Sequence, residues 1–195
     1  MKRTWKDYMW VVSLAYLILG FFHILFAWLG LLCFFIPLVL AISKKGKVYC
    51  HSYCGRGQLF QVLAKKLHLP VSRKVPRWIS SPLFRYGFLL FFLIMFLNMI
   101  MVTYLVFQTA SNLHTVVTLL WTIRLPWQWV QLSSSIPAWI YQFAFGFYSI
   151  MLTSTILGLV TMLLYRPRTW CVYCPMGTMT QLIAKGHQKK LFKGN

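Results

Sequence analysis

Four of the five cysteines occur as two close pairs, and such pairs are the side chains in this sequence best suited to metal chemistry. The first pair is Cys50 and Cys54, and the second is Cys171 and Cys174. Four thiolates that meet at one point form the ligand set of a tetrahedral zinc ion or of one iron–sulfur cluster. We therefore expect at most one such site. The fifth cysteine, Cys33, stands alone in an apolar stretch, where a thiol usually acts as a small hydrophobic side chain.

The residues that follow the two pairs also match each other. When Cys54 is set on Cys174, four further identities recur at fixed offsets: Gly57 with Gly177, Gln61 with Gln181, Ala64 with Ala184, and Lys65 with Lys185. Recurrence of this kind predicts an internal repeat. We expect one membrane domain, 1–195, with repeats at about 9–70 and 86–193. A pseudo-two-fold arrangement of the repeats would bring the two cysteine pairs together.

Composition and charge place these motifs in a membrane protein. Hydrophobic residues make up 59% of the chain, and segments 9–43 and 86–123 carry no charged side chain. Such runs are far longer than the helix of a soluble core. The chain has 20 Lys and Arg residues and a single acidic residue, Asp7. The basic residues cluster at the ends of the apolar spans. This is the positive-inside pattern and argues against a nucleic-acid partner, while the scarcity of carboxylates argues against a carboxylate-driven transporter.

The elements that must position the cysteines are predicted to be helices. We expect an all-α polytopic protein with four transmembrane helices in two hairpins, each hairpin followed by a cytoplasmic cysteine motif and an interfacial helix. The first hairpin, 9–43, is expected to turn near Trp28, Leu29 and Gly30, with a short interfacial helix at 58–68. The later spans are expected at about 86–107 and 139–165.

The predicted topology places both termini on the cytoplasmic face of the cell's inner membrane. Of the 20 Lys and Arg residues, only Arg124 would then lie outside. Arg124 falls in a polar, tryptophan-rich external segment at 108–137. Within that segment, residues 112–123 are apolar enough to form a partial or re-entrant helix.

The two cysteine motifs resemble those of a known family. Residues 50–61 read C-H-S-Y-C-G-R-G-Q-L-F-Q and residues 170–181 read W-C-V-Y-C-P-M-G-T-M-T-Q. These resemble the paired Cys-x-x-x-Cys-Pro motifs of membrane 4Fe-4S proteins of the NapH, NosR and CcoG type, here in a short form without a soluble ferredoxin domain. Two departures are Gly55, where the family has proline, and the shorter spacing of the second pair.

The resemblance implies one 4Fe-4S cluster bound by Cys50, Cys54, Cys171 and Cys174. It also implies an electron-transfer subunit of an oxidoreductase complex rather than a stand-alone enzyme. Such a subunit would link the quinone pool, as menaquinol or ubiquinol, to a redox partner protein in a larger complex. The basic helices after each pair would bind anionic lipid or, alternatively, dock an acidic electron-transfer partner.

Two other functions stay open on the residues alone. A DsbB-like thiol–disulfide and quinone oxidoreductase would need its cysteines to face the oxidising compartment, and a membrane scaffold would use the same thiolates to hold a structural zinc ion. His23 and His114 lie in or near the spans. For both side chains we expect a helix–helix hydrogen bond in preference to a contact with a quinone headgroup, and haem ligation is not expected.

Overall fold

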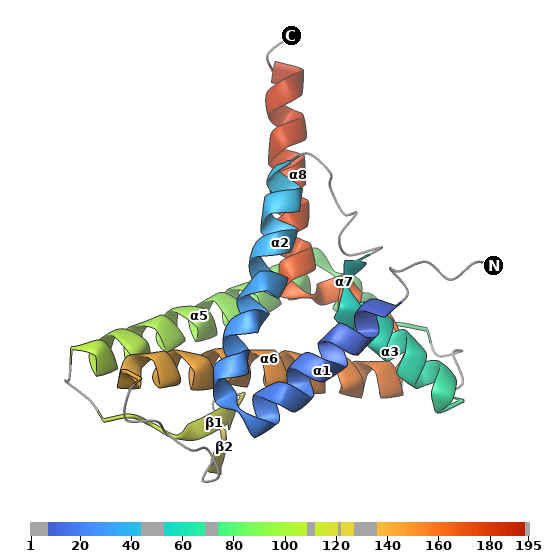
Figure 1. Ribbon diagram of the computed structural model, residues 1–195. Helices are drawn as coiled ribbons and strands as arrows, with labels where there is room; N and C mark the ends of the chain where they lie inside the picture. Colours follow the sequence, from blue (N-terminus) through green and yellow to red (C-terminus); the bar gives the residue numbers. More distant parts are fainter. Residues whose placement is uncertain are drawn as a thin grey trace.

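The computed structural model describes residues 8–43, 53–68, 74–108, 112–120, 122–126 and 136–193. Its described residues are mostly helical (Figure 1). The elements in chain order are α1 (Met9–Phe22), the 3₁₀ helix η2 (Ile24–Leu29), α2 (Gly30–Ile42), α3 (Gly55–Lys66), α4 (Arg77–Ser80), α5 (Pro82–Phe107), β1 (Val116–Leu119), β2 (Ile123–Pro126), α6 (Ala138–Leu164), α7 (Trp170–Tyr173) and α8 (Pro175–Lys193).

Three helical segments in the described part of the chain are long and apolar enough to cross a membrane. They are Ile24–Ile42, which joins η2 to α2, Pro82–Phe107 and Ala138–Leu164. At 1.5 Å per residue, the 14 residues of α1 reach only about 21 Å, less than the ~30 Å hydrocarbon core of a bilayer. The chain is therefore a multi-pass membrane protein, and a fourth span through α1 remains a prediction.

The first hairpin turns earlier than the sequence suggested, which corrects the predicted turn near Trp28, Leu29 and Gly30. The chain leaves the helical conformation at His23, with φ −138° and ψ 108°, and η2 then continues directly into α2. Gly30 has helical dihedral angles. A Cβ there would lie 2.5 Å from the Tyr16 hydroxyl and 2.6 Å from a Phe147 ring carbon. Gly30 thus serves close packing and not a turn.

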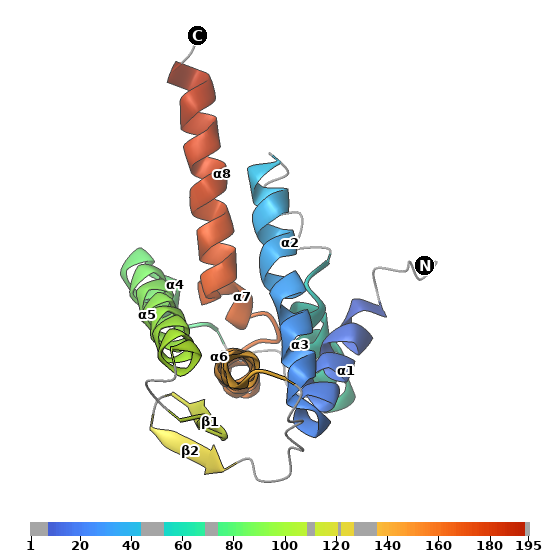
Figure 2. The ribbon, with the colours of Figure 1, turned by 60° about the vertical axis from the view of Figure 1, so that its left-hand side comes forward.

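Helix α6 lies at the centre of the structure. Seen end-on in Figure 2, α6 has α5 on one side and α1, α2 and α3 on the other, with the two strands beneath it. Helices α5 and α6 run side by side, whereas α2 crosses them steeply with α8 alongside it (Figures 1 and 2). The predicted arrangement of four spans in two hairpins is not confirmed and stays a prediction.

The segment after α5 contains a β-hairpin, which corrects the suggestion that residues 112–123 form a partial or re-entrant helix. Strands β1 and β2 pair antiparallel, with Val116 opposite Pro126 and Leu119 opposite Ile123. β-Branched residues such as Val116, Val117, Thr118 and Ile123 favour this conformation. Val117 is fully buried and belongs to a hydrophobic cluster that includes Tyr148 and other residues of α6. The all-α expectation thus holds in the coarser form of a mostly helical protein.

The two halves of the chain pack in a reciprocal way. Helix α3, which follows the first cysteine pair, contacts α1 of its own half and α6 of the other half. Helix α8, which follows the second pair, contacts α5 of its own half and α2 of the other half. Each post-cysteine helix is therefore held by the first helix of its own half and the second helix of the opposite half.

Helix α3 packs against α6 where the ring of Phe60, on α3, lies over Gly158, on α6. Phe60 is fully buried, and a Cβ added at Gly158 would collide with its ring. The missing side chain at Gly158 lets the two helices approach. Replacing Gly158 by valine should push α3 away from α6 and destabilise the protein by about 1–3 kcal/mol, the usual cost of overpacking.

The thermal unfolding midpoint in detergent measures this effect. Gly87→Val is the matched control, because nothing lies within 4 Å of a Cβ at Gly87, which is also helical. Both variants carry the same β-branched penalty in a helix. Equal midpoints for the two variants would contradict the docking described here.

Candidate metal centre

Cys54 and Cys174 occupy equivalent local positions. Each directly precedes a helix, α3 after Cys54 and α8 after Cys174. The Cys54 carbonyl accepts a bond from the Gln58 N–H at 3.1 Å, and the Cys174 carbonyl accepts one from the Thr178 N–H at 2.9 Å. The first N–H groups of a helix lack intrahelical acceptors and carry partial positive charge. Both cysteines therefore lie where negative charge is stabilised.

Cys54 and Cys171, from opposite halves of the chain, meet at Gly57. A Cβ placed on Gly57 would lie 3.4 Å from the Cys171 Sγ and 3.7 Å from the Cys54 Sγ. Gly57 is buried in the first turn of α3. Both sulfurs thus border a small space that any side chain larger than glycine would enter.

Gly55 explains one departure from the family motif. A Cβ at this position would meet the Met9 carbonyl oxygen and, at 2.7 Å, the Ser13 Oγ, both on α1. A proline would bring a ring to a point where α1 already touches the backbone. Glycine lets the start of α3, and with it Cys54, pack closely on α1.

The short helix α7, which carries Cys171, is anchored by an aromatic cluster of Phe84, Phe88 and Phe92 from α5 with Trp170 and Tyr173 from α7. The ring centroids of Phe88 and Tyr173 are 4.9 Å apart, and those of Trp170 and Tyr173 are 5.0 Å apart. Trp170 and Tyr173 are 2% and 3% exposed. Their burial fixes the backbone on both sides of Cys171.

Tyr173 remains a neutral hydrogen-bond donor beside Cys174. Burial raises the pKa of Tyr173 to about 12, the nearby Cys174 adds to this rise, and a hydrogen bond with Thr161 opposes it. The Tyr173 hydroxyl lies 3.1 Å from the Thr161 Oγ1, to which it donates. This bond ties α7 to the end of α6.

The remaining predicted ligands are less completely placed. Cys174 is half-buried and packs against the hydrophobic core around Phe60, Trp170 and Tyr173, and Cys50 lies outside the described residues. Within the described residues, no group of three or more His, Cys, Asp or Glu side chains is arranged to hold a metal ion. The structure therefore brings two of the four predicted ligands together, and the full set remains a prediction.

Arginine contacts around the site were not foreseen from the sequence. The Arg168 Nη2 donates to Gln61 Oε1 at 3.1 Å, and the Arg85 Nη2 donates to Gln181 Oε1 at 2.6 Å. Gln61 and Gln181 are the two glutamines matched in the repeat alignment, so their recurrence was the available signal. Each contact fastens a post-cysteine helix to another part of the chain.

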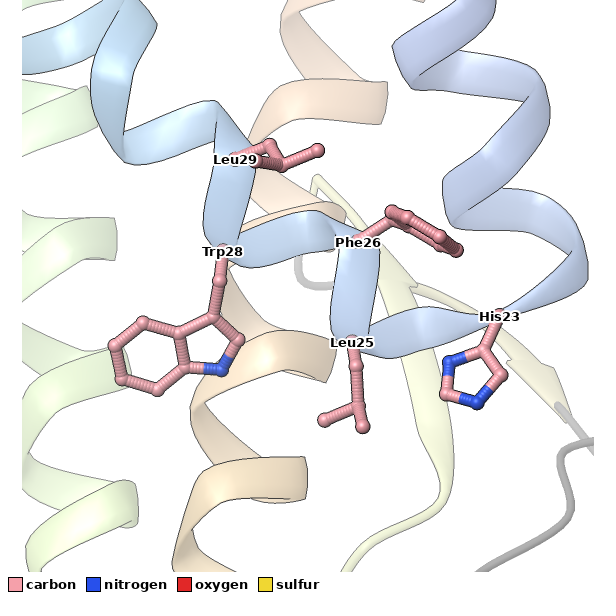
Figure 3. A pocket seen from close by; sticks show the side chains of 5 residues that line it. All are labelled: His23, Leu25, Phe26, Trp28 and Leu29. Atoms are coloured by element: carbon pink, nitrogen blue, oxygen red, sulfur yellow. The ribbon is translucent and has the colours of Figure 1, made fainter.

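His23 lies apart from Cys54, at the other end of α1. An open pocket of about 430 Å³ lies beside η2. Its lining side chains, shown in Figure 3, are His23, Leu25, Phe26, Trp28 and Leu29. His23 follows the end of α1, whereas Gly55 contacts Met9 at its start. About 20 Å of helix therefore separates the pocket from Cys54. His114 donates its backbone N–H to Gln142 Oε1 at 2.9 Å.

The donor set and its surroundings fit an iron–sulfur cluster. The ligands are thiols, Gly57 leaves the space between two sulfurs open, and two helix N-termini supply positive potential for an anionic group. The described cysteines Cys33, Cys54, Cys171 and Cys174 are all free of disulfide bonds.

Comparison with known proteins supports the same chemistry. No curated protein and no solved structure matches the chain significantly. The model of the family described as a 4Fe-4S binding domain matches residues 26–77 and 149–193, and each segment contains one cysteine pair. This favours the cluster over the zinc-scaffold and thiol–disulfide alternatives. The chain thus carries the 4Fe-4S binding domain signature in two segments, and its cofactor is an iron–sulfur cluster.

Proposed function

We propose that this protein is a membrane electron-transfer subunit with a single 4Fe-4S cluster held by Cys50, Cys54, Cys171 and Cys174. The observation that carries the proposal is the meeting of the Cys54 and Cys171 sulfurs at Gly57. Cysteines from distant parts of the sequence, joined by no disulfide, have little structural reason to converge on an open space. Metal or cluster ligation supplies that reason.

The chain's own residues have distinct tasks in this proposal. When bound, the cluster supplies reversible one-electron transfer. The four thiolates hold it, and the N-termini of α3 and α8 offset its negative charge. The aromatic cluster around α7 excludes water from one side of Cys171, which limits hydrolytic loss of iron. Gly57 keeps the space between the sulfurs clear.

The proposed topology puts both termini and both cysteine pairs on the cytoplasmic side of the cytoplasmic membrane. Exposed basic residues lie close to the site in sequence, and they include Lys65, Lys66, Arg166 and Arg168. Exposed basic side chains of this kind suit an acidic redox partner protein as well as anionic headgroups. The reciprocal packing of α3 and α8 supports two repeats related by a pseudo-two-fold axis.

The proposed electron donor or acceptor within the bilayer is a quinone. A subunit with a single cluster needs one partner that supplies electrons and one that accepts them, and the described residues contain three candidate membrane spans. A quinol dissolves in the lipid and can give up its two electrons one at a time, as a one-electron centre such as the cluster requires. The other partner is a redox protein in a larger complex.

Anaerobic reconstitution tests this function. Protein loaded with iron and sulfide, in phosphatidylcholine–phosphatidylglycerol vesicles, is mixed with menaquinol or ubiquinol, and the visible absorbance of the cluster is followed. We expect bleaching by a quinol, or reoxidation of dithionite-reduced protein by the matching quinone. A dithionite-reducible cluster that exchanges electrons with neither quinone couple would refute the quinone link. The Cys54→Ala protein controls for changes unrelated to the cluster.

A further inference from the structure

Arg56 reaches from the cysteine motif into the centre of the helix bundle. It is the second residue of α3, two positions after Cys54 and next to Gly57. Its Nη1 donates to the Ser154 Oγ at 2.5 Å and its Nη2 contacts the Met151 Sδ at 3.0 Å, both on α6. The side chain is partly buried, and the guanidinium is within electrostatic reach of Tyr16 and Cys33. Helices α1, α2 and α6 therefore surround the charge.

This position is unfavourable for a cation on three separate grounds. A guanidinium withdrawn from water loses hydration. A positive charge in the first turn of a helix opposes the helix dipole. Ser154 and Met151 are neutral, and the whole chain has one acidic residue, Asp7, which lies outside the described residues. Local rules broken together in this way usually mark a functional position.

The neighbouring cysteines supply the missing negative charge once they ligate a cluster. A cluster with four thiolate ligands is anionic, and its potential depends on the charges around it. Exposed Arg166 and Arg168 are screened by water and salt. Arg56 is held by two contacts on α6 and is partly buried, so water and salt screen its charge less than they screen the exposed arginines.

We propose that Arg56 is a positioning residue whose fixed positive charge is the counter-charge of the cluster, raising its reduction potential and linking its assembly to the docking of α3 on α6. This inference rests on the proposed cluster site. Without the cluster, no acidic side chain among the described residues balances the guanidinium. With the cluster, the charge is balanced, and the bonds to Ser154 and Met151 hold the guanidinium against α6.

The test uses the full-length protein, reconstituted anaerobically with iron and sulfide, and an electron paramagnetic resonance redox titration. Arg56→Gln should lower the midpoint potential, because the reduced, more negative cluster loses a stabilising charge. Arg56→Lys keeps the charge and should retain most of the wild-type potential. Arg166→Gln is the matched control, since it removes an exposed arginine near the same motif. Its shift should be smaller and should vanish in high salt.

Thermal unfolding with and without the cluster gives a second readout. Removing the charge should narrow the gap between the unfolding midpoints of loaded and cluster-free protein, because the cluster-free state no longer carries an unbalanced cation. A merely structural arginine would lower both midpoints alike. The alternative counter-charge of Arg56 is Asp7, which the Asp7→Asn variant tests. If Asp7→Asn loses as much stability as Arg56→Gln, Asp7 is the ion-pair partner of Arg56 and the proposal is overturned.

Each remaining outcome is decisive. An Arg56→Gln protein with a full cluster and the wild-type potential would overturn the proposal while leaving the cluster site intact. If Arg56→Gln binds no cluster, Arg56→Lys decides: a lysine variant that binds it supports a charge requirement, and one that fails equally shows that the contacts with Ser154 and Met151 matter instead. A wild-type protein that binds no cluster would refute the proposed function itself.

Discussion

Alanine at Cys54 or at Cys171 should remove the iron–sulfur cluster completely. The two sulfurs come from opposite halves of the chain and border the same space at Gly57, so we expect both to bind the same cluster. A cluster that loses one of four thiolates retains an open iron site that water can attack. Iron per chain and visible absorbance should therefore fall to the level of the cluster-free protein in either variant.

Cys33→Ala is the matched control for the cysteine variants. Cys33 is an exposed cysteine on α2, and its removal should leave iron content and absorbance at the wild-type level. A Cys171→Ala protein with its full absorbance would show that the two halves do not share a cluster. Equal losses in all three variants would point to general oxidation of thiols and not to ligation.

Alanine at Gly57 should cost the protein most of its cluster while leaving the polypeptide folded. The new methyl carbon would lie 3.4 Å from the Cys171 Sγ and 3.7 Å from the Cys54 Sγ, which is ordinary van der Waals contact with the two thiols. The cluster-free protein should therefore tolerate the change. Alanine is favoured over glycine in a helix by about 1 kcal/mol, so its unfolding midpoint should stay level or rise. The methyl group would instead occupy space that bound iron and sulfide require.

Opposite effects on stability and on cluster content distinguish this role from simple packing. Gly87→Ala is the control, since it is a helical glycine with nothing within 4 Å of the added Cβ, and it should keep the full cluster. Iron content is measured after identical anaerobic reconstitution of both variants. A Gly57→Ala protein with wild-type iron would place the cluster away from Gly57.

Apolar length predicted the later helices well. Spans expected at 86–107 and 139–165 are observed at Pro82–Phe107 and Ala138–Leu164, because a long uncharged run has few alternatives in a membrane protein. The repeat predicted that the two cysteine pairs come together, and the structure places one sulfur of each pair, Cys54 and Cys171, near Gly57. The recurrence of Gly57 and Gln61 at matched offsets marked residues that the structure places against Cys171 and Arg168.

Contacts between distant helices could not be predicted in the same way. Glycine is common in turns, yet Gly30 is not in one. Its missing side chain lets the side chains of Tyr16 and Phe147 lie close to the backbone. The apolar segment that forms β1 reads equally well as helix or strand, because short apolar runs do not reveal their periodicity. The bonds from Arg56 to α6 and from Arg85 to α8 depend on tertiary packing, which no local pattern encodes.

The most direct test of the central claim is the iron and acid-labile sulfide content of anaerobically purified protein, with an electron paramagnetic resonance spectrum recorded after dithionite reduction. One 4Fe-4S cluster requires about four iron and about four sulfide per chain and gives a reduced-cluster signal. We expect that result for the wild-type chain. Zinc without iron or sulfide, or no metal at all, would contradict the account.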